Sequence, residues 1–308
     1  MAWLQRLNDP LRLAPTGTLG ETYAALLERL GTVAPFELAV LGGRAMATPF
    51  ELAVLGGRAM ATPGLAFLVG YQAALRVLWP SAPHSLGALC ATERRSVRPA
   101  DMHTRLDALR LSGCKDFVTA GLEAEWLLVA ARSEAAGAAP QLSLAVVYPG
   151  EPGVTLEPLP TLPLMPEVGH GRLLLEQASC ELLAGDGWDA YVKPFRSLED
   201  LYVLTALTAW LYGVGQECAW PQGLRLQLLG LLAGCAEGSR QCADSMGCHL
   251  LLGGLFAQFQ ALRGEVDAAL AAGPVHWAQI WQRDQGVMAL AASAREKRLN
   301  KAWVAAGL

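Results

Sequence analysis

The sequence predicts an α+β protein with N-terminal helices, a middle antiparallel β-barrel or sandwich, and a C-terminal four-helix bundle. Apolar residues recur with the helical period near both ends of the chain. The middle instead carries short runs rich in Val and Leu, separated by Pro and Gly. Of the 308 residues, 53% are apolar and 17% are charged, which is enough for a large core. The expected domains are residues 1–84, 85–186 and 187–308.

Two segments of the N-terminal part have clear helix signals. Thr18-Leu19-Gly20-Glu21 is a capping box, in which the Thr and Glu side chains satisfy backbone N–H groups at a helix start. It predicts a helix to about Leu30. A second, mostly apolar helix is expected from Pro63 to Trp79, and the residues from Pro80 to Pro83 end it.

An unchanged tandem duplication lies between these two helices. Residues 35–48, PFELAVLGGRAMAT, recur as residues 49–62. Thr48-Pro49-Phe50-Glu51 is another capping box, so each copy is expected to form its own short helix, ending at the Gly-Gly or before the next Pro. The added copy is either an inserted helical turn that the fold tolerates or the cause of an altered interface or a swapped helix.

The middle segment is expected to contain short strands. The clearest strand patterns are 126–131, 142–148, 154–156 and 172–175, and Pro149-Gly150-Glu151-Pro152-Gly153 is the clearest turn. His170 lies between two glycines and is expected on a loop.

From Trp188 onward the helical period returns. The expected helices are 196–218, 221–236, 248–271 and 275–305, separated by Pro221, Gly247 and Gly273-Pro274. Four long helices in succession are typical of a bundle.

Charge and cysteine content exclude several classes of partner. The net charge is −4 without a basic block, which argues against nucleic acid or an anionic membrane surface. No signal peptide is evident, and the longest apolar run, 201–215, is shorter than a bilayer span. Seven scattered cysteines do not suggest a disulfide framework, and Cys242, Cys248 and His249 lack zinc-site spacing. We therefore expect a cytoplasmic protein without a metal site, and the absence of G-x-G-x-x-G excludes a Rossmann-type site.

Two segments of the middle domain carry the strongest site signal. Cys90-Ala91-Thr92-Glu93 and Gly113-Cys114-Lys115-Asp116-Phe117-Val118-Thr119-Ala120-Gly121 both have the pattern of strand ends that close on turns. Each leaves one hydroxyl, on Thr92 or Thr119, where a flat polar ligand could be hydrogen-bonded.

This pair of segments resembles the A-x-T-E and G-x-K-x-F/W-I/V-T-x-G blocks of the acyl-CoA dehydrogenase family. A strand ending in Ala131-Arg132 follows here, as in the family. The resemblance implies the order of helices, β-domain and four-helix bundle, and a bound FAD. It also implies that Thr92 and Thr119 hydrogen-bond the flavin, that Phe117 packs on the ring, and that the protein is a homodimer or homotetramer acting on an acyl-CoA-type substrate.

Two departures from the family leave alternatives open. Arg94, Arg95 and Arg98 follow Glu93 where the family has a Gly-Ser-Asp turn, and they could bind a phosphate or form a solvated loop. The family's Tyr-Glu-Gly-Thr base segment is also missing at 281–288. Leu198-Glu199-Asp200-Leu201 resembles the Leu-Glu-Arg-Leu setting of the isovaleryl-type base, which makes Glu199 a candidate base or an ordinary acidic residue in a first helical turn.

The expected function is therefore FAD-dependent α,β-dehydrogenation of an acyl thioester, an oxidoreductase activity. The alternatives are a catalytically silent relative that serves as a binding or assembly module, and a flavin-dependent monooxygenase-type relative. Bound flavin distinguishes the silent relative from the two enzymes.

Overall fold

The computed structural model describes residues 2–8, 12–13, 17–31 and 47–308. These residues form two compact units. The sheet unit comprises residues 78–162 and 166–196, and the helical unit comprises the described residues of 1–77 together with 163–165 and 197–308. The division into three domains at residues 84 and 186 stays a prediction.

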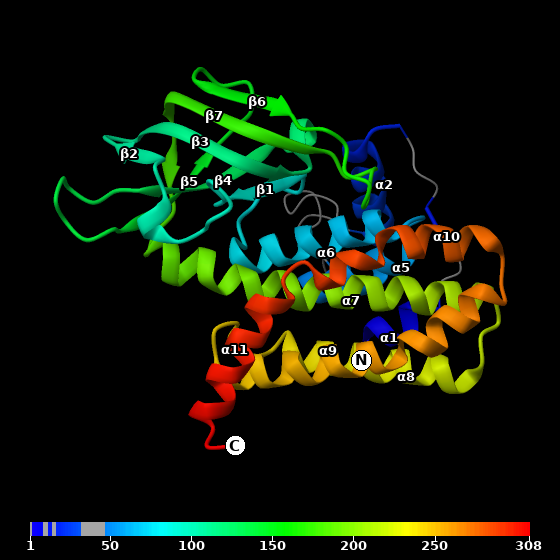
Figure 1. Cartoon of the computed structure of the whole chain (residues 1–308). Coiled ribbons are helices and arrows are strands. Elements are labelled where there is room, and N and C mark those ends of the chain that lie inside the picture. Colours follow the sequence, from blue (N-terminus) through cyan, green and yellow to red (C-terminus); the bar gives the residue numbers. More distant parts are fainter. Residues whose placement is uncertain (1, 9–11, 14–16, 32–46) are drawn as a thin grey trace, which may run out of the picture. The chain divides into compact units, whose positions relative to one another are not determined.

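The sheet unit is built on one eight-stranded sheet, and Figure 1 labels its strands β1 to β7. Its strand order is β6-β7-β3-β2-β4-β5-β8, and β1 also pairs with β4. The strands are β1 Gly87–Cys90, β2 Arg105–Asp107, β3 Arg110–Thr119, β4 Trp126–Arg132, β5 Leu142–Val147, β6 Val154–Pro158, β7 His170–Ser179 and β8 Glu181–Leu182. Short helical turns are η2 Pro99–Asp101, η3 Gly121–Glu123 and η4 Gly187–Val192.

The sheet is mixed rather than purely antiparallel. Strands β1 and β2 pair with β4 in the parallel sense, while the remaining neighbours are antiparallel. Residues 126–131 of β4 are all buried, which explains why this strand reads as a continuous apolar run. The strands expected at 126–131, 142–148 and 154–156 are confirmed within one or two residues at their ends.

The helical unit contains both ends of the chain. Its elements are α1 Ala2–Arg6, α2 Leu19–Leu30, α4 Pro49–Glu51, η1 Leu52–Gly56, α5 Gly57–Ala59, α6 Pro63–Leu78, α7 Lys193–Glu217, α8 Gln222–Gly238, α9 Met246–Ala271, α10 Val275–Asp284, η5 Gln285–Ala289 and α11 Ala292–Ala305. Figure 1 shows α8 beside α9, and α11 packs on α9 as well.

The second copy of the duplicated segment forms a buried helix. Its start is the predicted capping box, in which the Thr48 hydroxyl accepts from Glu51 N–H and the Glu51 carboxylate accepts from Thr48 N–H. The helix continues through the Gly-Gly and ends at Met60, before Pro63. A Cβ on Gly57 would lie 2.4 Å from the carbonyl oxygen of Ala206, so only glycine allows α5 to approach α7 so closely. The first copy lies outside the described residues, apart from its last two.

The predicted helix over 275–305 is wrong as a single element. Helix α10 ends at Asp284, the η5 turn follows, and α11 starts at Ala292. The buried Asp284 carboxylate explains the break, because it accepts from Met165 N–H at 2.9 Å and pairs with Arg283 at 2.6 Å. A side chain that holds a distant segment in this way fixes the helix end. The other three bundle helices are confirmed.

An aromatic cluster forms part of the helical core. Trp210 of α7 stacks on Trp281 of α10 at 6.0 Å between ring centroids and meets Trp277 edge-on at 5.7 Å. The Arg12 guanidinium lies 4.6 Å above the Trp277 ring and 2.9 Å from the Glu217 carboxylate. These contacts join the N-terminal segment to the bundle.

Candidate functional site

Thr92, Phe117 and Thr119 lie together in the sheet unit. Thr92 follows β1, and its carbonyl oxygen accepts from Asp116 N–H of β3 at 3.0 Å. Phe117 and Thr119 come one and three residues further along β3. Both threonines are half-buried. The two segments that the sequence singled out are therefore direct neighbours, as their hydroxyls require to share one ligand.

A β-bulge directs the Phe117 side chain. Lys115 pairs with Leu173 and Val118 with Gly171, so β3 has one residue more than β7 between these two positions. Bulges of this kind redirect a side chain and are common beside active sites. Phe117 is 39% exposed, although Lys115 and Val118, the paired residues at the two ends of the bulge, are buried. The ring is thus available to a ligand.

His170 is a site residue that the sequence placed wrongly. It is the first residue of β7 rather than part of a loop, and it pairs with Thr119. Its ring stacks on Phe117 with centroids 4.3 Å apart. Burial lowers the pKa of His170 below its ordinary value, so the imidazole is neutral at pH 7. The flanking glycines hid the strand signal, because glycine is uncommon in strands.

A buried ion pair holds the two segments together. The Lys115 ammonium lies 2.6 Å from the Glu93 carboxylate, and the two side chains are 0% and 6% exposed. The same carboxylate accepts from His103 N–H at 2.6 Å and from Thr104 N–H at 3.2 Å. Burial would raise the pKa of Glu93, but Lys115 and these donors outweigh it and hold the pKa below its usual range. Glu93 is therefore ionised at neutral pH.

Glu199, the candidate base, belongs to the helical unit. It is a half-buried residue of α7, and it makes contacts of its own. Its neighbour Asp200 is buried and pairs with Arg295 of α11 at 2.7 Å and with Arg298. Asp200 stands where the family has an arginine, and this arrangement gives that acid a structural role.

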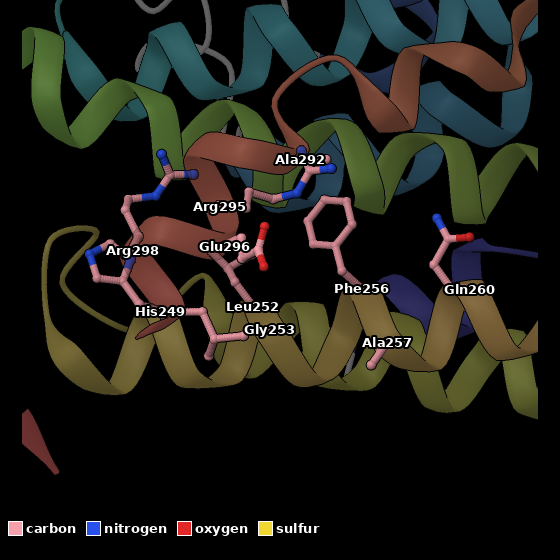
Figure 2. A pocket seen from close by; sticks show the side chains of 11 residues that line it. His249, Leu252, Gly253, Phe256, Ala257, Gln260, Ala292, Arg295, Glu296 and Arg298 are labelled. Atoms are coloured by element: carbon pink, nitrogen blue, oxygen red, sulfur yellow. The ribbon is translucent and has the colours of Figure 1, made fainter. Parts of the chain in front are cut away.

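A cavity of about 240 Å³ lies between α9 and α11 in the helical unit (Figure 2). Apolar side chains such as Leu252, Phe256 and Leu299 line much of it. Arg295, which also faces it, is engaged by Asp200 and lies 3.9 Å above the Phe256 ring. This cavity is built from residues other than the candidate site residues.

Among the described residues, no group of three His, Cys, Asp or Glu side chains is arranged to hold a metal ion. No helix in that part of the chain has the length and apolar character needed to span a bilayer.

The chain matches several solved structures over nearly its whole length. FkbI, described as serving biosynthesis of the methoxymalonyl extender unit of the polyketide Fk520, is 18% identical, with a TM-score of 0.64 over 99% of this chain and 98% of that one. Butyryl-CoA dehydrogenase from Megasphaera elsdenii is 12% identical, with a TM-score of 0.64 over 97% and 92%. The prolyl acyl carrier protein oxidase AnaB is 15% identical, with a TM-score of 0.59 over 92% and 84%.

Sequence comparison alone does not reach these proteins. No protein-family profile matches the chain, and no curated protein sequence matches it. The identities to the solved structures are low enough that they establish the fold and not the activity. The predicted resemblance is confirmed at that level: this chain has the acyl-CoA dehydrogenase fold.

Proposed function

We propose that this protein binds a flavin at Thr92, Phe117 and Thr119 and catalyses the α,β-dehydrogenation of an acyl thioester. The observation that carries the proposal is the junction of the two segments, which the Asp116–Thr92 backbone hydrogen bond and the Glu93–Lys115 ion pair hold side by side. Two solved structures of the same fold are, by their descriptions, a butyryl-CoA dehydrogenase and an acyl carrier protein oxidase.

The residues present fit an isoalloxazine ring. A flavin ring needs an apolar face contact and hydrogen-bond partners along its polar edge. Phe117 offers an aromatic side chain that is 39% exposed, and the half-buried residues Thr92 and Thr119 each offer a hydroxyl. The neutral imidazole of His170 packs against the Phe117 ring.

Each residue has a defined task in this proposal. The threonine hydroxyls orient the cofactor by hydrogen bonds, and Phe117 excludes water from one side of the ring. When bound, the flavin would supply the two-electron acceptor for a hydride from the substrate's β-carbon. Glu199 would accept the proton from the α-carbon, because an ionised carboxylate is a suitable base for a proton made acidic by the adjacent thioester.

We also propose that the protein is a homodimer or homotetramer. Leu290, Trp303, Val304 and Leu308 near the C-terminus are 51–78% exposed. Burial of exposed apolar side chains of this size against a second copy of the chain would stabilise an oligomer. Light scattering after size-exclusion chromatography measures the mass directly, and a monomer at micromolar concentration would overturn this proposal.

The first test is the visible absorption spectrum of the purified protein. Flavin bands near one equivalent per chain, or their appearance after FAD is added, are expected. Thr92→Val and Thr119→Val remove a hydroxyl at nearly constant shape, and each should weaken flavin binding roughly tenfold, the effect of about 1.4 kcal/mol for a lost hydrogen bond. Thr155→Val is the matched control, because Thr155 is an exposed residue of β6.

The second test separates dehydrogenation from the alternatives. Anaerobic addition of an acyl thioester should bleach the flavin absorption, and Glu199→Gln should retain flavin but lose the bleaching. Flavin that resists every acyl thioester would favour monooxygenase-type chemistry instead. A protein that binds no flavin would be a catalytically silent relative.

A further inference from the structure

Three arginines beside the proposed flavin site have unengaged side chains. Arg94, Arg95 and Arg98 are exposed, and within the described residues their guanidinium groups form no hydrogen bond or ion pair. Other arginines of the sheet unit are used structurally. Arg105 and Arg132 bind the Glu134 carboxylate, and Arg110 and Arg172 bond to Ser179 and Cys114. The three unengaged cations lie within five residues of the sequence.

A tightly bonded turn presents the first two of these arginines. Glu93 and Ser96 exchange backbone hydrogen bonds of 2.9 and 2.8 Å across it. Arg94 and Arg95 are its central residues, with φ of 47° and 63°, as in the type I′ turns that favour Asn-Gly. The Asp116 carboxylate accepts from Arg94 N–H, which ties the turn to β3.

The nearby acids are engaged by the turn and its flank. Asp116 bonds to the Arg94 backbone, and Asp101 accepts from the Ser96 hydroxyl at 2.6 Å. Glu93 is paired with Lys115 beneath the turn. The three arginine side chains therefore meet solvent with no carboxylate bound to them, which is the arrangement that attracts an anion.

We infer that the Arg94–Arg95 turn, with Arg98, binds the phosphate of the phosphopantetheine arm that carries the acyl thioester. This inference rests on the proposed function, which places the flavin at Thr92, two residues before Arg94, and therefore requires the acyl thioester to reach the flavin from nearby. Guanidinium groups match the geometry of phosphate oxygens. The exposure of the arginines to solvent suits a substrate that must leave after each turnover better than a permanently bound cofactor. Coenzyme A and an acyl carrier protein present the same phosphate.

Calorimetric titration of the purified protein tests the inference. The two ligands are 4′-phosphopantetheine and its phosphate-free analogue pantetheine, and each is titrated with and without added FAD. We expect the phosphorylated arm to bind at least about tenfold more tightly, the effect of one charge-assisted hydrogen bond. The double variant Arg94→Asn/Arg95→Gly should abolish this preference while preserving the melting temperature, because Asn-Gly suits the turn at least as well.

A second turn in the same unit supplies the matched control. Ala108 and Leu109, between β2 and β3, also have positive φ, of 45° and 61°. Ala108→Asn/Leu109→Gly changes a turn of the same kind without removing a cation, and the preference for the phosphorylated arm should remain.

Three results would overturn the inference. They are equal binding of the two arms, a phosphate preference that survives in Arg94→Asn/Arg95→Gly, and a loss of FAD affinity in that variant in place of a loss of arm affinity. Failure of the proposed function is recognised separately, by the absence of flavin bands or of bleaching. Steady-state kinetics give a second readout. Compared with the wild type, Arg94→Asn/Arg95→Gly should have a higher KM at unchanged kcat, both for acyl-CoA and for an acyl carrier protein thioester. A rise for only one of them identifies the natural carrier.

Discussion

The two units use buried charge in different ways. In the sheet unit, the Glu93–Lys115 ion pair joins the two segments that hold the candidate flavin residues. In the helical unit, Asp200 joins α7 to α11 through Arg295 and Arg298, next to the candidate base Glu199. The Glu93–Lys115 pair lies in the two segments that match the family's motif blocks. Asp200, in contrast, stands where the family's motif has an arginine. The difference follows from what the residues do: Glu93 and Lys115 hold together the segments that carry the candidate site, so the motif around them serves both the fold and the site.

The largest expected effect is the loss of the sheet unit's ion pair. Lys115→Met would leave the Glu93 carboxylate buried without its counter-ion, which should cost about 3–5 kcal/mol of unfolding free energy. Denaturant unfolding monitored by circular dichroism measures it. Flavin binding should weaken with it, because the segments of Thr92 and Thr119 lose their connection.

The control for this variant is Lys193→Met. Lys193 forms an exposed ion pair with Asp189 four residues away, at 3.2 Å. Such surface pairs contribute at most about 1 kcal/mol, so stability should barely change. Equal effects of the two substitutions would show that burial of the Glu93–Lys115 pair has no special weight.

The corresponding change in the helical unit should be smaller and should spare the flavin. Asp200→Asn removes the charge that Arg295 and Arg298 share, but these arginines are 15% and 18% exposed and keep some contact with water. We expect a loss of about 2 kcal/mol with unchanged flavin affinity. Glu296→Gln is the control, because it removes an exposed carboxylate from α11, the helix of both arginines. Weaker flavin binding in Asp200→Asn would contradict the separation of roles.

A third prediction concerns acid stability of the sheet unit. Hydrogen bonds from Arg132, supported by Gln141 N–H and Arg105, lower the pKa of Glu134 to about 2 despite its burial. A carboxyl group with a depressed pKa stabilises the fold above its unfolded pKa of about 4.3, and this contribution is lost as the pH falls toward 2. The wild-type melting temperature should therefore drop across that range.

Glu134→Gln tests this linkage. The variant should be less stable at pH 7, and its melting temperature should change less between pH 4.5 and 2 than that of the wild type. Glu181→Gln, at an exposed position of β8, should keep the wild-type profile. Parallel wild-type and Glu134→Gln profiles would refute the assignment.

Local signals explain which parts of the fold the sequence could predict. The capping boxes at Thr18 and Thr48 set helix starts through contacts only three residues apart, and the structure confirms both. The parallel pairing of β1 with β4, in contrast, joins Gly87 to Trp126 and leaves no local pattern. The break after Asp284 depends on Met165, far away in the sequence, so periodicity alone could not show it.

The candidate site residues differ in the same way, between those with a local sequence signal and those that depend on distant contacts. Motif spacing led to Thr92, Phe117 and Thr119, because the residues that build the junction lie within two short segments. From the sequence alone, His170 is expected on a loop instead, because its place beside Phe117 depends on the pairing of β7 with β3, which joins residues far apart in the sequence. Glu199 has only a four-residue resemblance behind it and stays a prediction.

The smallest expected effect comes from removing one copy of the duplicated segment. Deletion of 35–48 and deletion of 49–62 give the same chain, because the copies are identical. The remaining copy can make every contact that the second copy makes with α7, including the hydrogen bonds of Arg58 to Gln216. We therefore expect a folded protein with unchanged flavin affinity.

The start of the remaining helix in the shortened chain differs in one residue from that of the second copy in the full-length protein. Ala34 would take the N-cap position that Thr48 occupies now, and an alanine there typically costs about 1 kcal/mol. Ala34→Thr in the shortened chain should restore the melting temperature of the full-length protein. If the shortened chain fails to fold with either residue at position 34, the duplicated segment is required by the helical unit itself, because the sheet unit loses none of its residues in the deletion.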